Sequence, residues 1–249
     1  HVNFQQLASD RAAYRLADQY DQEVLGYLCG FKQSSLSSVA GTANTTVSGT
    51  KAVSSAASNE LLASMLVDAN DFNGGTASNS IVVVPRGHGQ AVDSTTATAS
   101  PMSVIARMSR KLDQQFVDKD NRWLVIDPVF AELLQDEDSR LMQGDWVTDS
   151  NQIKNGLIIN NIHGFKVYQS NNLPSVGNGP TGATSTGSSH YGVICAGHNS
   201  AVATAEQINK TESYRDPDSF GDIVRGMHLY GRKILRPEAL TRAYYVSKI

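Results

Sequence analysis

The residues that could carry chemistry in this 249-residue chain are few, and the most suggestive are glycines. Gly177, Gly179 and Gly182 have the G-x-G-x-x-G spacing that lets a backbone approach a pyrophosphate at the start of a helix. The context does not suit a dinucleotide, because Pro174 separates the glycines from the preceding apolar segment and residues 184–189 do not predict a helix. The pattern therefore favours a surface loop.

The histidines and serines do not combine into a hydrolase site. His88 and His198 could each serve a Ser-His-Asp triad, but the chain lacks the G-x-S-x-G pentapeptide that holds a nucleophilic serine between a strand and a helix. Four further histidines are scattered, without the i, i+4 pairing or the cysteine partner of a zinc site: His1, His163, His190 and His228. We predict ordinary surface or core histidines.

The acidic residues and the cysteines also lack the spacing of metal sites. The acidic run 136–138 is followed by Arg140, which suits a solvated helix end, since the oxygen spacing of a calcium-binding loop is absent. Cys29 and Cys195 are too few for a disulfide framework, and we expect buried thiols in a reducing cytosol. The sequence thus predicts no catalytic, cofactor-binding or metal-binding residue, no cofactor and no enzymatic activity.

Charge and hydropathy narrow the possible partners. A formal charge of −3 and a pI near 6.1 give no chain-wide basic surface, so contact with nucleic acid should be weak, local and non-specific. No apolar run approaches the roughly 20 residues that cross a bilayer, and we expect no membrane partner. The sequence starts at His1, and we expect a further segment upstream of it.

The elements that would position functional side chains are best defined between residues 122 and 174. An apolar strand at 122–126 is stopped by Asp127 and Pro128, and a short helix follows over 129–135. A second apolar strand begins near Gly156 and ends in a turn rich in Ser, Asn and Pro at 170–174. This segment predicts packed structure without an activated nucleophile.

Helical patterns come before that segment. Ser9 offers an N-cap for a helix of about 21 residues over 10–30, which Gly30 would stop. Pro101 begins another helix that runs to Phe116. We expect three residues of this helix to pack against three residues of the following strand: Ile105, Met108 and Leu112 against Trp123, Leu124 and Ile126.

Weaker signals define the remaining elements before residue 100. Val2 and Phe4 alternate like the end of a strand whose partner lies upstream, and the polar stretch 34–58 predicts a loop or hairpin. Ser58 could cap a helix with an apolar stripe over 61–66. Residues 81–84 predict a short buried strand.

The C-terminal part predicts strands without helices. A loop at 175–189 leads into a strand at 191–195, and residues 201–208 are predicted to continue its sheet. Residues 209–221 are polar, and a strand over 222–236 ends at Pro237. Helices and strands follow one another without regular alternation and without an internal repeat, which favours the α+β class.

The order and spacing of these elements resemble the major capsid (coat) proteins of tailed bacteriophages. Residues 164–174 read like the Gly-Phe-x-Val-x-x-Ser-x-x-Leu-Pro strand and turn of that family. Residues 226–239 are similar to its closing Gly-x-x-x-Tyr-Gly-x-x-x-x-Arg-Pro-x-Ala segment. The remaining segments of the resemblance are the helices at 10–30, 102–116 and 129–135 and the strands at 122–128 and 191–205.

The resemblance implies a Hong Kong 97-type phage capsid fold with a long spine helix, a peripheral domain and an axial domain. The implied limits are 1–8 for the end of an extended loop, 9–100 for the spine helix and insertions of the peripheral domain, 101–208 for the axial domain, and 209–249 for C-terminal strands that return to the peripheral domain. The upstream segment is expected to be needed for closed assembly.

The resemblance also implies the function. The chain is expected to assemble with itself, as hexameric and pentameric capsomers, into the icosahedral head shell around the double-stranded DNA of a tailed phage. Further expected partners are a scaffolding protein, a portal and a decoration protein, with assembly in the host cytoplasm and final location in the virion. Two alternatives remain: an encapsulin-like cellular shell protein and, from the glycines at 177–182, a soluble nucleotide-dependent enzyme.

Overall fold

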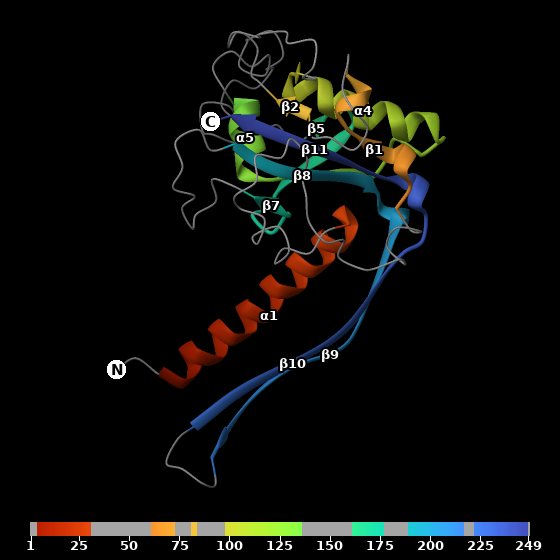
Figure 1. Cartoon of the computed structure of the whole chain (residues 1–249). Helices are drawn as coiled ribbons and strands as arrows, with labels where there is room; N and C mark the ends of the chain where they lie inside the picture. Colours follow the sequence, from red (N-terminus) through yellow and green to blue (C-terminus); the bar gives the residue numbers. More distant parts are fainter. Residues whose placement is uncertain are drawn as a thin grey trace.

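The computed structural model describes residues 4–30, 61–72, 81–83, 98–135, 161–176, 189–216 and 222–248. They form a nine-stranded mixed sheet with helices on its faces, from which one long helix and a two-stranded ribbon extend together (Figure 1). This mixture of helices and sheet confirms the predicted α+β class.

The sheet is built around its last strand. Strand β11 (Leu240–Lys248) lies antiparallel to β8 (Ser189–His198) along its whole length and parallel to β1 (Leu66–Val67) and β2 (Ile81–Val83). Strand β8 pairs on its other side with β4 (Arg122–Ile126), which is parallel to β6 (Phe165–Gln169). The short strands at the margins are β1 (Leu66–Val67), β2 (Ile81–Val83), β3 (Thr98–Ala99), β5 (Asn161–Ile162) and β7 (Ser175–Val176).

Alternating side chains of the central strands point to opposite faces of the sheet, as the period-two geometry of a strand requires. One face packs against helices α4 (Pro101–Gln114) and α5 (Pro128–Gln135) in the main apolar cluster, which contains Leu124, Ile126 and Tyr245. The other face carries a smaller cluster with Val193 and Cys195, to which the end of the long helix contributes Cys29. The sheet is therefore covered on both faces.

The expected contact between the helix from Pro101 and the following strand is confirmed for two of the three strand residues. Leu124 and Ile126 are fully buried in the cluster that holds Ile105, Met108 and Leu112. Trp123 is only partly buried and packs against both apolar clusters. Its predicted contact is therefore partial, because successive side chains of a strand point to opposite faces of the sheet.

Capping residues in the sequence predicted the positions of helices α4 and α5 correctly. The Ser100 hydroxyl accepts a hydrogen bond from the Ser103 amide (3.3 Å), and Pro101 occupies the first turn, as the sequence predicted. At α5, the Asp127 carboxylate accepts a hydrogen bond from the Phe130 amide (3.2 Å). The second apolar strand is a hairpin instead, with β5 and β6 joined by a turn in which His163 and Gly164 have positive φ.

The N-terminal region differs from the prediction. Helix α1 spans Phe4–Cys29, so Phe4 begins a helix and Ser9 lies inside it, not at its cap. Val2 and Ser58 lie outside the described residues. The apolar residues after Leu61 form a short 3-10 helix (Ala63–Met65) and strand β1, because Thr241 and Lys111 donate hydrogen bonds to the carbonyls of Met65 and Leu66 (both 2.7 Å).

The C-terminal region also differs. Residues 201–208 do not continue the sheet: β9 (Val202–Arg215) pairs with β10 (Asp222–Ile234) in a separate two-stranded ribbon. Residues 209–215, predicted as a polar connection, belong to β9. The sequence did not predict β11 beyond Pro237. The expected domain limit between residues 208 and 209 falls inside β9, and the domain limits stay a prediction.

Replacing Leu124 by alanine should lower the free energy of unfolding by about 2–5 kcal/mol, because a fully buried leucine leaves a cavity against α4. Val125→Ala is the matched control, since its partly buried side chain points to the other face and should cost about half as much or less. Chemical denaturation of the two variants measures the difference. Equal losses would contradict the assignment of the two faces.

Candidate functional site

The described residues bring none of the predicted chemical candidates together. The glycines at 177–182, His88 and the acidic run 136–138 lie outside the described residues. His198 ends β8, where its Nδ1 accepts a hydrogen bond from the Ser200 amide (3.1 Å) and caps a short 3-10 helix. His163 lies in an exposed turn. Within the described ranges, no three His, Cys, Asp or Glu side chains are grouped to hold a metal ion.

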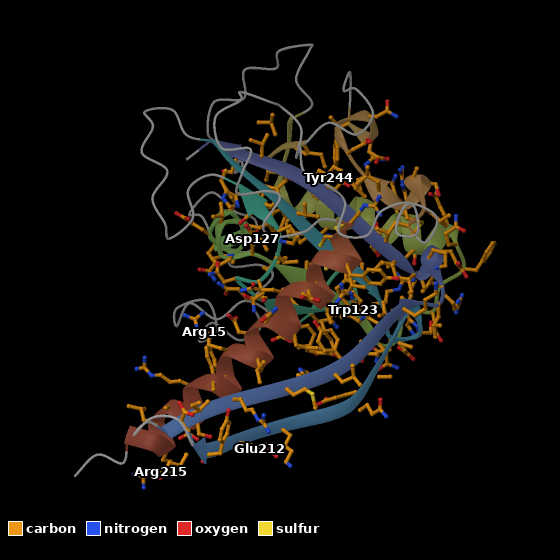
Figure 2. The ribbon with its side chains drawn as sticks, turned by 60° about the horizontal axis from the view of Figure 1, so that its bottom comes forward. Arg15, Trp123, Asp127, Glu212, Arg215 and Tyr244 are labelled. Atoms are coloured by element: carbon orange, nitrogen blue, oxygen red, sulfur yellow. The ribbon has the colours of Figure 1, made fainter. Side chains whose placement is uncertain are left out.

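We call the nine-stranded sheet together with α4 and α5 the sheet body. A buried polar cluster joins three elements of this body. The Asp127 carboxylate accepts hydrogen bonds from the Tyr245 hydroxyl (2.5 and 2.6 Å) and lies 2.8 Å from His190 Nε2. At most 4% of each residue is exposed. Burial, and then the neighbouring carboxylate, raise the pKa of the Tyr245 hydroxyl well above its usual value. Figure 2 labels Asp127 next to α5.

This cluster has a structural role, because it connects a helix to two strands of the sheet. The Asp127 carboxylate also caps α5, so one side chain links that helix to β8 through His190 and to β11 through Tyr245. Gly192 makes room for the tyrosine, because a Cβ at this position would lie 2.5 Å from the Tyr245 ring. Sequence reasoning identified Asp127 only as the end of a strand, since its partners are 63 and 118 residues away.

Removing the Tyr245 hydroxyl should destabilise the body and change its alkaline unfolding. Tyr245→Phe leaves the buried carboxylate with one donor fewer, which costs about 1–3 kcal/mol at neutral pH. Because the folded-state pKa of Tyr245 is raised, its contribution is complete below about pH 10 and is lost as pH rises through the folded-state pKa. The wild type should therefore lose stability more steeply above pH 10 than Tyr245→Phe does.

Denaturation at a series of pH values measures both effects. Tyr168→Phe is the control, because this tyrosine is 56% exposed on β6 and its loss should leave stability unchanged. Parallel alkaline profiles of wild type and Tyr245→Phe would contradict the role given to the buried hydroxyl.

The second notable arrangement lies outside the body, where α1 packs against one face of the ribbon. The Glu23 carboxylate accepts hydrogen bonds from the Tyr230 hydroxyl (2.7 Å) and from Arg232 (2.9 Å). These two contacts lower the pKa of Glu23, the hydrogen bond from Tyr230 most of all. The Tyr20 ring meets the Tyr230 ring edge-on at 4.7 Å, and Arg232 lies over the Tyr27 ring. Polar and aromatic contacts therefore fix α1 along the ribbon.

No described helix or strand covers the opposite face of the ribbon. His228, Tyr230 and Arg232 of β10 point to α1, so the odd-numbered side chains point away from it. Exposed apolar side chains gather there, and with Tyr214 of β9, whose backbone pairs with Ile223, they make up what we call the ribbon face: Tyr214 (42% exposed), Ile223 (37%), Met227 (56%) and Leu229 (49%).

Charged residues lie between these apolar side chains. The Glu212 carboxylate contacts Lys210 and, at 3.1 Å, Arg225, and the Arg225 guanidinium lies over the Tyr214 ring. Lys210 lowers the pKa of Glu212 more than Arg225 does. In Figure 2 the ribbon carries Glu212 and Arg215 far from the sheet body, with α1 on one side.

The ribbon is incomplete as an isolated structure. Two strands alone are marginally stable in water, and their outer edges expose unpaired backbone groups. Four of the ten large apolar side chains that are exposed in the described part of the chain lie on the ribbon face. A surface of this kind marks a protein interface. The arrangement is suited to association and not to the transformation of a small molecule.

A model of the phage capsid protein family matches residues 3–243. The chain belongs to the phage capsid protein family. The family is structural and not enzymatic, which confirms the prediction that the chain is a phage major capsid protein without enzymatic activity and rejects the nucleotide-dependent enzyme. No curated protein matches the chain significantly.

Solved phage structures are similar to this chain. The capsid of cyanophage P-SCSP1u matches with 16% identity and a TM-score of 0.56 over 100% of this chain and 68% of that chain. Mycobacterium phage Che8 matches with 26% identity, a TM-score of 0.47 and coverage of 68% of this chain and 53% of that chain. The mature capsid of bacteriophage PhiM1 matches with 16% identity, a TM-score of 0.44 and coverage of 68% and 50%.

The chain spans about half the length of the Che8 and PhiM1 chains that it matches. The capsid similarity confirms the Hong Kong 97-type fold that the resemblance implied. None of the described helices is both long enough and apolar enough to cross a membrane.

Proposed function

We propose that the chain is the major capsid protein that builds the icosahedral head shell of a tailed phage around its double-stranded DNA. The ribbon face is the observation that carries this proposal, because an apolar surface on a projecting two-stranded ribbon needs a partner to cover it. In a shell of identical chains the partner is another copy.

The physical logic of a shell favours such a surface. Many modest contacts make a closed shell stable through their number, while each single contact stays weak enough to be corrected during assembly. The ribbon face combines apolar side chains with the ion pairs of Glu212, so it can be covered by a neighbour without an extended apolar surface in the free chain. Hexameric and pentameric capsomers would repeat this contact.

The separation of α1 and the ribbon from the sheet body also suggests how the elements divide between two domains. We assign α1 and the ribbon to the peripheral domain and the sheet body with α4 and α5 to the axial domain. Of the expected limits at 8/9, 100/101 and 208/209, the first falls inside α1 and the last inside β9, and β11 returns to the sheet of the axial domain.

The further partners follow from the proposed role. A scaffolding protein and a portal would direct assembly in the host cytoplasm, a decoration protein would bind the finished head, and the virion would be the final location. The formal charge of −3 favours weak, non-specific contact with packaged DNA.

The decisive experiment is expression of the complete gene product, with a scaffolding protein where one is required, followed by electron microscopy. Closed icosahedral particles that package double-stranded DNA during infection would support the proposal. Shells that enclose cargo enzymes would favour the encapsulin-like alternative. Monomers under all assembly conditions would contradict both.

Placing a charge on the ribbon face should prevent assembly without unfolding the chain. Met227→Glu puts a carboxylate where we expect a neighbour to exclude water, while the free chain leaves this side chain 56% exposed. The melting temperature of the unassembled chain should stay within about 2 °C of the wild type, because exposed substitutions cost little. The yield of shells should fall by at least about tenfold, which corresponds to 1.4 kcal/mol of lost contact energy.

Met227→Leu is the matched control, since it keeps the apolar surface and should assemble like the wild type. Sedimentation and electron microscopy measure the yield. Normal shells from Met227→Glu would show that the ribbon face is not an assembly contact.

A further inference from the structure

The end of helix α4 has a backbone conformation that its sequence does not suit. The Val117 amide donates a hydrogen bond to the Leu112 carbonyl and the Phe116 amide donates one to the Asp113 carbonyl, both at 3.1 Å. This pair of bonds is the Schellman motif, in which the residue after the cap adopts the left-handed conformation and is usually glycine. Here that residue is Phe116, with φ of +54°.

Neither folding nor local packing explains a phenylalanine at this position. The side chain is 95% exposed, the largest exposure among the large apolar residues that the structure describes. A left-handed conformation is strained for a bulky side chain, so glycine would suit the turn better. The apolar contact of the motif is supplied by Val117 and Leu112, which are both buried in the main cluster.

A rigid support holds this turn in place. The Arg122 side chain is 1% exposed and donates hydrogen bonds to the carbonyls of Val117 (2.5 Å) and Asp118 (2.7 Å). It also donates to the Asp113 carboxylate at 2.8 Å. One buried guanidinium thus joins the last turn of α4 to the segment after Phe116. The ring is presented to solvent from a fixed backbone, which reduces the entropy lost when it is bound.

A second exposed apolar side chain lies at the same end of the sheet. Arg122 pairs with His198 at the end of β8, and the Leu235 amide donates a hydrogen bond to the Ala201 carbonyl just after it (2.8 Å). Leu235 is 60% exposed. The segments that carry Phe116 and Leu235 therefore both flank the end of the sheet where β4 begins and β8 ends.

We infer that Phe116 is an anchor residue that packs against the ribbon face of a neighbouring copy of this chain during shell assembly. This inference rests on the proposed function. A copy of the chain is the partner because every lateral surface of a shell subunit meets other copies. The exposed residues after the ring, Asp118, Lys119 and Asp120, have one acidic side chain in excess. On the ribbon face, Lys210 and Arg225 flank Glu212, so basic side chains are in excess among the apolar residues, and the two surfaces are complementary in charge.

The test compares assembly with stability in the complete gene product. Phe116→Gly removes the ring and relieves the strained φ, so the melting temperature of the unassembled chain should equal or exceed that of the wild type. The yield of shells should nevertheless fall by at least about tenfold, because the loss of one contact is repeated in every subunit. Phe116→Tyr keeps an aromatic ring and should retain assembly.

The control is Asn121→Gly, which relieves another positive φ (+58°) in the same connection but leaves the ring in place, and which should assemble normally. A photoreactive phenylalanine analogue at position 116 should form covalent dimers in shells and none in the unassembled chain. Wild-type shells together with normal assembly of Phe116→Gly, or a cross-link to a different protein, would overturn the inference. Absence of wild-type shells would instead overturn the proposed function.

Discussion

The pairing of β11 with β8 is the constraint on which the rest of the structure depends. Nine backbone pairs, from Leu240 opposite Gly197 to Lys248 opposite Ser189, join the last strand of the chain to the strand that leads into the ribbon. On its other edge β11 receives β1 and β2, and its Tyr245 reaches the carboxylate that caps α5. Removing β11 would separate the marginal strands from β8 and leave Asp127 with one donor fewer.

The body and the projecting part are stabilised by different interactions. The body has two apolar clusters on a covered sheet, with a single buried carboxylate that connects α5, β8 and β11. The projecting part has one helix, two strands and a contact made of Glu23, Tyr230 and Arg232 at the surface. A chain of this design keeps a stable body while its association surfaces stay outside the core, as a structural subunit requires.

Local signals explain what the sequence could predict. Ser100 with Pro101, and Asp127 with Pro128, carry their capping information within a few residues, and α4, β4 and α5 were placed correctly for that reason. The apolar residues after Leu61 were wrongly predicted as a helix. Their backbone groups bond instead to β11, Lys111 and Thr241, which are distant in sequence. Strand β9 was read partly as a polar connection because the ribbon packs on one face only, so no apolar run marks it.

The sequence alone could not identify the candidate assembly residues, for a related reason. Met227 and Phe116 look like ordinary apolar residues of a strand and a helix, and only the register of the ribbon and the φ of one turn reveal them as exposed. The absence of chemical sites was predictable from spacing alone, whereas surface association depends on which side of an element is left uncovered.

The position of β11 also determines when the molecule can finish folding. Strands β1, β2 and β8 all precede β11, their common partner at the centre of the sheet, so none of them can complete its pairing before β11 has been synthesised. Pairings between segments that are distant in the chain are also slow to form. A nascent chain without β11 therefore has no finished sheet to offer to a partner.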